Sequence, residues 1–594
     1  MIRLRNYRLR LAKRDDGFVM IMVIAIGAVL MILATVAAGY AVSGLNKANM
    51  DQNYSGALSA AYAGVEEYQS RLANDTSYTQ YGNPSANFSS ASTLILPTAA
   101  NQVNPAFGVG STGTWATVAG SGGLARFRYE VDNSAYSSSG VIRIRSTGAV
   151  GNSTRSVVAN LKQQGFLDFL YFTDYEIQDP AVSNDPASCI MYAWAGRNSS
   201  CSTIQFASTD SIKGPVHSND TIRICGSTFN GTVTTSNSKV DGNGNLYTIP
   251  GGCSDGVFKF GKPAYSPVVG MPSTNSQMKK QTRSDLTTAG VPNPGCLYTG
   301  PTSITYNTGG TMTVRSPWTK AVNVVGDPAT SGAVNAACGT PGTSSNQLGS
   351  AAGQTITVPT QIVVFVQNVP TVSSDPNYWG SSTPGGGYTC TGAAGGTTVG
   401  NGIGYPATSE TAPGGTSTPY GCQNGDVFVS GTLSAGTSAG SQQTVAAENY
   451  VYVTGDLKYN DPSADLLGLV GNNAVWVWNP VNGNSNLLSD SARRIDAAII
   501  SVAHTFQVQN FNKGGVRGSL TVNGAIAQKF RGPVGTGSSS GPVTGYSKNY
   551  VYDARLKYTA PPKFLSPVTT TYGVTTWMDV APAFATDGSK NAGT

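Results

Sequence analysis

The stretch RDDGFVMIMVIAIGAVL (residues 14–30) changes from charged to apolar at one point, directly after Asp16. The run from Phe18 to Tyr40 is mostly aliphatic, and no charged residue occurs again before Lys47. About 20 apolar residues in a helix are enough to cross a bilayer. The apolar core of a secretory signal peptide has only about 7–15 residues, so this longer run predicts a helix that inserts into a membrane.

The helical pattern continues beyond the apolar run. No proline occurs before Pro84, and small or apolar residues recur at helical spacing at Ala57, Ala60, Ala61, Gly64, Val65, Tyr68 and Leu72. A continuous helix from Phe18 to about Ala73 would be roughly 84 Å long at 1.5 Å per residue. A simple anchor has no need of this length. A filament subunit does, because one half of its helix packs in the filament and the other half holds a globular head.

Basic residues are concentrated before the helix. Residues 1–17 contain six Lys or Arg and two Asp, a net charge of +4, so the remaining chain carries +2 of the total of +6. Basic flanks tend to stay in the cytoplasm, which places the chain after about residue 45 outside the cell. The nearly neutral remainder lacks the basic surface that nucleic-acid binding usually needs, so no nucleic acid is expected as a partner.

The composition also favours an extracellular, β-rich protein over a cytosolic enzyme. Charged residues make up 11% of the chain, and 72 of the 594 residues are Gly. Typical globular domains have about 25% charged residues and about 7% Gly. The hydrophobic fraction of 40% argues against disorder for most of the chain.

All eight cysteines lie beyond the apolar segment: Cys189, Cys201, Cys225, Cys253, Cys296, Cys338, Cys390 and Cys422. An even number confined to the translocated part predicts disulfides. Pairing of sequence neighbours is the simplest arrangement because it closes short loops, although eight cysteines allow about 105 pairings. Zinc is the competing interpretation, but no Cys-x-x-Cys occurs and His217 and His504 are the only histidines, so no metal is expected.

The leader, the Gly17-Phe18 junction, the uncharged helix and the amphipathic AAYAGVEEYQSRL (60–72) together resemble the type IV prepilins and pseudopilins. This resemblance implies that a membrane-embedded prepilin peptidase cuts after Gly17 and methylates the new N-terminus at Phe18. It also implies a single-pass membrane protein that later reaches an extracellular pilus, with other major and minor pilins as partners.

One position departs from the pattern of major pilins, which carry Glu as the fifth mature residue to neutralise a neighbour's terminal amine. Counted from Phe18, this position is Met22. Burying an unpaired amine is costly, so Met22 resembles the tip-associated minor pilins of the PilX type and the capping pseudopilins. Segments such as GCLYTGPTSITY (295–306) resemble the β-helical C-terminal regions of PilX-type proteins. The resemblance implies a tip subunit that primes assembly and presents an adhesive surface to a host, surface or glycan receptor.

The predicted fold is mainly β, with a long N-terminal helix, a small antiparallel sheet and a large right-handed parallel β-helix-like region. Alternation in FRYEV (127–131) and VIRIR (141–145) predicts the antiparallel strands. The predicted domains are a leader (1–17), a helix (18–73), a pilin-like head (74–165), a β-helix-like repeat domain with Cys-bridged loops (166–570) and a C-terminal tail (571–594).

An internal repeat supports the β-helix. VAAENYVYV (445–453) aligns with LVGNNAVWV (469–477), and VSGTL (429–433) aligns with VTGDL (453–457), both at an offset of 24 residues. Periods of this length indicate stacked structural repeats. Short strands with Gly at the bends favour a parallel β-helix with one coil per repeat. An array of stacked β-sandwiches is the alternative.

Catalysis is not expected, and no cofactor is predicted. A β-helix that cleaves polysaccharide often has clustered carboxylates or Lys/Arg in a groove, and glycoside cleavage needs two carboxylates roughly 5–10 Å apart. The candidates are Glu448 with Asp456, and Asp553 with Arg555. Acidic residues number only 31, and none recurs at coil spacing. The main alternative function is therefore a membrane-anchored surface β-helix protein that acts on or binds cell-envelope polysaccharide.

Three further patterns have a structural and a functional interpretation. Isolated histidines are more often structural than catalytic. KVDGNGNLY (239–247) places Asp241, Asn243 and Asn245 at calcium-loop spacing, but Asx-Gly turns explain it at least as well. Aromatic residues at alternating strand positions have an outward half that could form a stacking stripe for a glycan or surface: Tyr450, Tyr452, Trp476, Trp478, Tyr546, Tyr550 and Tyr552.

Overall fold

The computed structural model describes residues 16–98, 103–110, 113–136, 140–163, 165–287, 290–385, 388–391, 400–411, 420–436, 440–538, 541–567 and 572–591. The chain folds into two compact units. We call residues 1–163 and 570–594 the head unit, and residues 164–569 the inserted unit.

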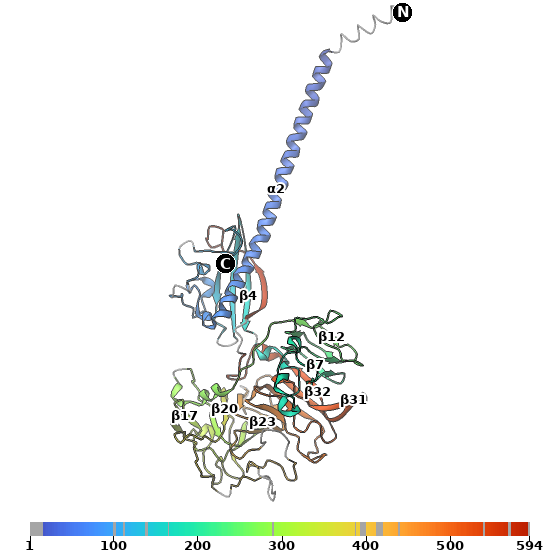
Figure 1. The fold of residues 1–594 in the computed structure, drawn as a ribbon. Helices are drawn as coiled ribbons and strands as arrows, with labels where there is room; N and C mark the ends of the chain where they lie inside the picture. Colours follow the sequence, from blue (N-terminus) through green and yellow to red (C-terminus); the bar gives the residue numbers. More distant parts are fainter. Residues whose placement is uncertain are drawn as a thin grey trace, which may run out of the picture. The chain divides into compact units, whose positions relative to one another are not determined.

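A single helix dominates the head unit. Helix α2 runs from Asp16 to Asn74 over 59 residues, within two residues of the predicted ends (Figure 1). The absence of proline and the many Ala, Leu and Met residues favour this uninterrupted helix. Three short 3-10 helices follow it: η1 (Thr76–Gln80), η2 (Asn87–Ser89) and η3 (Pro105–Phe107).

The head sheet is antiparallel, as predicted. Its strand order is β1 (Ala116–Thr117), β2 (Ala125–Asp132), β3 (Val141–Val150), β4 (Ser153–Gln163) and β33 (Tyr572–Val580). Val150 pairs with Ser153 at the end of β3, so Gly151-Asn152 forms a two-residue hairpin loop. Gly151 has φ 54°, which Gly adopts without strain and which such tight hairpins require.

The C-terminal half of α2 packs on this sheet. Its buried residues are those that the helical spacing selected: Ala57, Ala60, Ala61, Val65, Tyr68 and Leu72. A Cβ atom at Gly148 of β3 would overlap the carbonyl oxygen of Ala57 and the backbone nitrogen of Ala61. Glycine at this position therefore permits the close approach of helix and sheet.

The predicted separate C-terminal tail (571–594) is not what the structure shows. Strand β33 pairs with β4 from Tyr572↔Gln163 to Val580↔Ser156, and Figure 1 shows it in red beside the strands of the head. Tyr572 is fully buried in the head core. The open edge of β4 is paired by a strand that the chain supplies only after the inserted unit. The inserted unit is therefore an insertion between two neighbouring antiparallel strands.

The inserted unit is built mainly from parallel strands. One row contains β14 (Cys296–Thr299), β20 (Ile362–Gln367), β22 (Gln442–Ala447), β24 (Leu466–Gly471), β28 (Arg493–Ser501), β30 (Val516–Phe530), β5 (Tyr171–Tyr175), β8 (Val216–Ser218), β11 (Val233–Thr235) and β13 (Ala264–Tyr265). A second row contains β15 (Thr302–Asn307), β21 (Val427–Leu433), β23 (Tyr450–Tyr459), β25 (Ala474–Val477) and β29 (Phe506–Val508). A third contains β32 (Gly541–Tyr552), β7 (Ser211–Lys213), β10 (Thr228–Phe229) and β12 (Val257–Phe258), beside the first half of β30.

The remaining elements are short or antiparallel. The strands are β16 (Thr311–Arg315), β19 (Gln354–Thr357), β31 (Gly535–Ser538), β17 (Asn323–Val325), β18 (Ser331–Ala333), β26 (Val481–Asn482), β27 (Ser485–Asn486), β6 (Phe206–Ala207) and β9 (Ile224–Cys225). The helices are η4 (Phe166–Asp168), α4 (Pro180–Ser183), η5 (Ala187–Cys189), η6 (Ala193–Ala195), η7 (Ser276–Thr282), η8 (Ser284–Leu286), η9 (Ala336–Cys338) and η10 (Ala554–Lys557).

The 24-residue repeat is the pairing register of neighbouring parallel strands. Val445 pairs with Leu469, and Val429 pairs with Val453, both 24 residues apart. The same ladder position continues as Leu469↔Ile499 and then Ile499↔Ile526, so like side chains stack in the core. This parallel register is the one that a β-helix requires. The right-handed coil itself stays a prediction.

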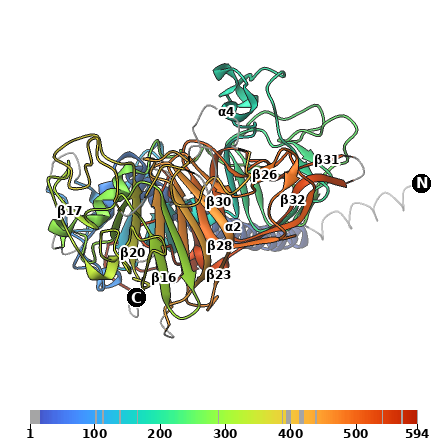
Figure 2. The same cartoon turned by 90° about the horizontal axis from the view of Figure 1, so that it is seen from below.

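The spatial order of the parallel strands differs from their order in the chain. Strand β5 pairs with β30 on one side and with β8 on the other, and β7 pairs with β32. Strand β5 therefore lies in the middle of its row, although it comes early in the chain. The next strands, β8, β11 and β13, extend the row to one end. The later strands run from β14 at the other end to β30, which pairs with β5. We call the β30–β5 and β32–β7 pairings the seam; Figure 2 shows orange β30 and β32 next to the teal segment.

Candidate functional site

The N-terminal half of α2 exposes an apolar surface. Its large apolar side chains from Phe18 to Leu45 are between 49% and 78% exposed. The helix contains an 18-residue window with a mean hydropathy of 2.9 that is entirely unburied, so by length and composition it could cross a membrane. A surface of this kind normally contacts lipid or another protein.

The predicted processing positions lie at the start of this surface. Gly17 and Phe18 belong to the first turn of α2, and Phe18 is 69% exposed. Met22 lies one turn further along the helix and is also exposed. Cleavage after Gly17 and methylation of Phe18 stay predictions.

Two polar contacts hold the other half of α2 on the head sheet. Glu67 accepts a hydrogen bond from the Tyr129 hydroxyl at 2.7 Å and is ion-paired with Arg71. Gln69 donates to the Tyr572 carbonyl oxygen of β33. These contacts, added to the buried Ala and Tyr residues, fix this half of the helix on the sheet, whereas the other half is uncovered by the described residues of the head unit.

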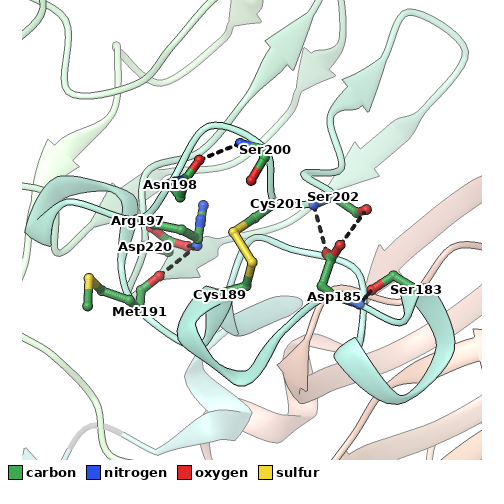
Figure 3. The surroundings of a disulfide bond; sticks show 10 residues. All are labelled: Ser183, Asp185, Cys189, Met191, Arg197, Asn198, Ser200, Cys201, Ser202 and Asp220. Carbon is green, nitrogen blue, oxygen red and sulfur yellow. Dashed lines mark hydrogen bonds and ion pairs between the residues drawn. A yellow bond between two sulfur atoms is a disulfide. The ribbon is translucent and has the colours of Figure 1, made fainter.

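The eight cysteines form four disulfides between sequence neighbours, as predicted: 189–201, 225–253, 296–338 and 390–422. The Cys189–Cys201 bridge closes a loop, and just outside it Asp185 accepts hydrogen bonds from the backbone nitrogen and the hydroxyl of Ser202 at 2.8 and 3.2 Å (Figure 3). Arg197 forms a buried ion pair with Asp220 beside it (Figure 3). Both cysteines of the 189–201 and 296–338 bridges are buried in core clusters, so these bridges fasten their loops directly to the core.

The weak calcium-loop candidate forms an Asx turn. Asp241 Oδ1 accepts hydrogen bonds from the backbone nitrogens of Asn243 and Asn245, each at 2.8 Å. Lys262 Nζ donates to the Asn245 side-chain oxygen at 3.0 Å. These backbone bonds lower the pKa of Asp241. The ammonium group of Lys262, beside Asn245, would repel a metal cation. The turn explains the spacing of these residues.

The candidate carboxylates take part in structural contacts. Asp456 pairs with Lys458 at 2.9 Å and accepts from the Arg494 backbone nitrogen. Glu448 accepts from the Asn368 backbone nitrogen at 2.7 Å and lines a cavity of about 690 Å³. No contact between Glu448 and Asp456 is present among the residues that the structure describes.

Asp553 and Arg555 form one local structural unit. The Asp553 carboxylate pairs with the Arg555 guanidinium at 2.6 Å and accepts from the Arg555 backbone nitrogen, which caps η10. The guanidinium also donates to the Asp465 carbonyl oxygen at 2.9 Å. Arg555 therefore fastens this turn to the residue that precedes β24, and the pair has a structural role.

The two histidines lie in different surroundings. His217 is fully buried between Phe169 and Phe172, and burial lowers its pKa to about 4. Its ring nitrogens lie 2.9 Å from the Thr234 hydroxyl and 3.1 Å from the Asn219 side-chain oxygen, so the neutral ring is fully hydrogen-bonded. His504 is about one-third exposed, and its Nδ1 lies 2.8 Å from Asp179 Oδ2.

The hypothesis of an outward aromatic stripe is wrong for these residues. Tyr450, Tyr452, Trp476, Trp478, Tyr546 and Tyr550 are all buried, and Tyr552 is half-buried. Tyr452 stacks on Phe428, whose other neighbour is Tyr405 at a ring distance of 3.9 Å. Tyr405 belongs to a long loop that covers this face. The apolar area of stacked rings favours this cover over exposure to water.

A buried charged cluster at the seam was not predicted. Lys548 pairs with Asp210 at 2.9 Å, and Arg531 pairs with Glu176 at 2.7 Å. A sequence signal existed, because Lys548 lies between Tyr546 and Tyr550 on the inward-facing alternation of its strand. The acidic partners are more than 330 residues away in the chain, and sequence reasoning had no means of pairing them.

No family model and no curated protein matches the chain. Among solved structures, the competence-associated pilin ComZ from Thermus thermophilus is similar with a TM-score of 0.26 and 12% sequence identity. The similarity covers 89% of this chain and 97% of that chain. At this level the likeness carries no argument about the fold or function of the present protein.

Proposed function

We propose that the chain is a minor pilin of a type IV-like pilus, cut after Gly17 and placed at the filament tip. The observation that carries the proposal is the division of α2 into two halves. One half packs on the head sheet through small residues, whereas the other presents large apolar side chains from Phe18 to Leu45 that no described residue of the head covers.

The exposed half supplies the energy for membrane insertion and then for assembly. Burying one large apolar side chain contributes roughly 1.5–3 kcal/mol, and more than a dozen such side chains are exposed here. A helix that leaves the bilayer loses lipid contacts, so neighbouring pilin helices must replace them.

Met22 supports a position at the tip over one in the shaft. A shaft subunit uses a carboxylate at this place to pair with a neighbour's terminal amine, and methionine cannot do so. A subunit with Met22 fits where no such pairing is needed. From that position it would prime assembly.

The inserted unit is proposed as the contact surface, with a role in binding and not in catalysis. The candidate carboxylates are held by backbone nitrogens, Lys458 and Arg555, and His217 is buried and neutral. The strand rows and disulfide-bridged loops of the inserted unit are suited to presenting an adhesive surface.

The N-terminus of the protein from the cell envelope provides the first test. Mass spectrometry should identify N-methyl-Phe18 as the first residue. An intact leader starting at Met1, with normal pili in a strain that lacks the protein, would overturn the proposal and favour the membrane-anchored surface protein.

Antibody labelling of purified pili tests the position. We expect label at one end of each filament. The Met22→Glu variant should move label into the shaft, whereas Met22→Gln, which places an uncharged polar side chain at the same exposed position, should not. Equal labelling along the shaft by the natural protein would contradict a tip position.

A further inference from the structure

Lys548 is an inward-facing lysine in the core of the inserted unit. It alternates with Tyr546 and Tyr550 on β32, and all three side chains are buried. Its Nζ lies 2.9 Å from Oδ2 of Asp210, which is also buried. Placing these two charges in the core is costly compared with two apolar residues of similar size, so the pair needs an explanation beyond stability.

The pair lies on the two strands that close the seam. Asn549 pairs with Ser211 and Tyr550 pairs with Ile212 in a parallel register. Lys548 and Asp210 are the preceding residues of these strands and lie side by side. They are 338 residues apart in the chain, so a bond between them would join the first part of the inserted unit to its last.

The surroundings of Lys548 make its amine easier to deprotonate than an exposed lysine amine. Burial lowers the pKa of Lys548; Asp210 opposes this effect, and the positive charge of Arg531 adds to it. Arg531 and Lys548 share the ring of Phe206, with Cζ 3.6 Å and Nζ 5.9 Å from its centre. A neutral lysine amine is a nucleophile, whereas the ammonium ion is not.

The same cluster contains polar atoms without a partner. In the described part of the chain, Arg531 Nε and Nη2 and Glu176 Oε1 are buried and make no hydrogen bond. Leaving such groups unsatisfied in a core is destabilising, and they call for a functional explanation. Guanidinium donors can stabilise a developing oxyanion, and a free carboxylate oxygen can carry a proton.

We propose that Lys548 and Asp210 condense to an intramolecular isopeptide bond that locks the seam. The ammonium first passes a proton to the carboxylate along the existing hydrogen bond. The neutral Nζ then attacks Cγ, and the Nζ–Cγ bond forms while Arg531 faces the negative charge on oxygen. A second proton moves from Nζ to the leaving oxygen, with Glu176 as the carrier. The Cγ–O bond breaks, one water leaves, and a neutral amide replaces the ion pair.

This cross-link does not depend on the proposed function. A pilin without the bond and a cross-linked surface protein that is not a pilin are both possible outcomes, and different experiments separate them. The bond would protect the unit against opening at the seam, where strands from distant parts of the chain are joined.

Peptide mapping of the reduced and alkylated full-length protein tests the proposal. Trypsin should release residues 198–213 joined to residues 532–555, uncut after Lys548, at the sum of the two masses less one water. The Lys458–Asp456 pair is the matched control. Lys458 Nζ and Asp456 Oδ2 are also 2.9 Å apart, but the side chains are 45% and 42% exposed. We expect no bond there, so trypsin should cut after Lys458 and no mass should be lost as water.

Two variants sharpen the result. Lys548→Arg keeps the positive charge but should give no linked peptide. Asp210→Asn should give the linked peptide with ammonia lost in place of water. If the natural protein yields free peptides cut after Lys548, and no linked pair, the proposal is overturned whether or not the variants fold.

Discussion

The head unit and the inserted unit stabilise their cores in different ways. The head covers an antiparallel sheet with one long helix, and Ala and Gly residues at the contact let the backbones approach closely. The inserted unit stacks short parallel strands into ladders such as Val445, Leu469 and Ile499, and all four disulfides lie in it. The difference indicates that a covering helix makes covalent bridges unnecessary, whereas long loops over short strands rely on them.

The largest expected effect is loss of the Cys296–Cys338 bridge, which spans 42 residues. Replacing both cysteines by serine should lower the free energy of unfolding of the inserted unit by about 4 kcal/mol. Hydrogen exchange with mass spectrometry should show faster exchange in strands β14 and β20 and unchanged exchange in β2 and β3. Replacement of Cys189 and Cys201, which close a 12-residue span, should cost less, about 3 kcal/mol. Equal loosening of both units would break the comparison.

A matching disturbance of the head is Gly148→Val. Its side chain would meet the backbone of α2 at Ala57 and Ala61, so the head should lose about 3 kcal/mol while the inserted unit stays intact. Gly56→Ala is the control, because a Cβ there would have ordinary contact with Val150. Thermal unfolding followed by limited proteolysis measures both. A head as stable in the valine variant as in the control would contradict the close helix–sheet contact.

Acid should weaken the inserted unit through His217. Its folded pKa of about 4 is lower than the ordinary 6.5 because burial disfavours the charged ring. As pH falls from 6.5 to 4, the His217 ring is therefore protonated in the unfolded chain but stays neutral in the folded chain. The free energy of unfolding should decrease across this window by up to about 3 kcal/mol.

The His217→Gln variant isolates this contribution, since only the difference in pH slope between the two proteins reports on the ring. Asp426 acts in the opposite direction. Burial raises its pKa to about 7, so its contribution to stability falls as pH rises from about 4 to 7. Urea unfolding at several pH values measures both slopes. Parallel slopes for the natural protein and the glutamine variant would exclude the histidine effect.

The smallest effect on stability is expected for Ile32→Glu. Ile32 is 62% exposed on the free half of α2, so the unfolding of both units should change by less than about 0.5 kcal/mol. Membrane insertion should be lost, because a carboxylate near the middle of the span costs about 3 kcal/mol. Membrane flotation assays compare the variant with Ile32→Leu. A stability loss as large as that of Gly148→Val would show that this half has a partner within the protein.

Local patterns in the sequence were sufficient for several features. The uninterrupted apolar and then amphipathic run gave α2 with its buried face at Ala57, Val65 and Leu72. The 24-residue alignment gave the parallel register of β22 and β24. Neighbour pairing of cysteines was predictable because short loops keep paired residues close together.

Contacts between distant segments were beyond such patterns. Strand β33 has no local signal that assigns it to the head sheet, so it was predicted as a tail. The aromatic residues of β23 and β25 have the alternation of an exposed stripe, and only the loop that contains Tyr405 determines that they are covered. The Lys548–Asp210 contact depends on a register between strands 338 residues apart.

The sequence by itself determined the long helix, its two halves, the mainly β remainder and the pairing of the cysteines, because each depends on spacing along a short stretch of chain. The tertiary structure alone decided that the head sheet is completed from the C-terminal end, that the aromatic face is buried, and that opposite charges meet at the seam. These outcomes depend on which open strand edges and apolar faces become neighbours in space, and that information is not contained in any local window of residues.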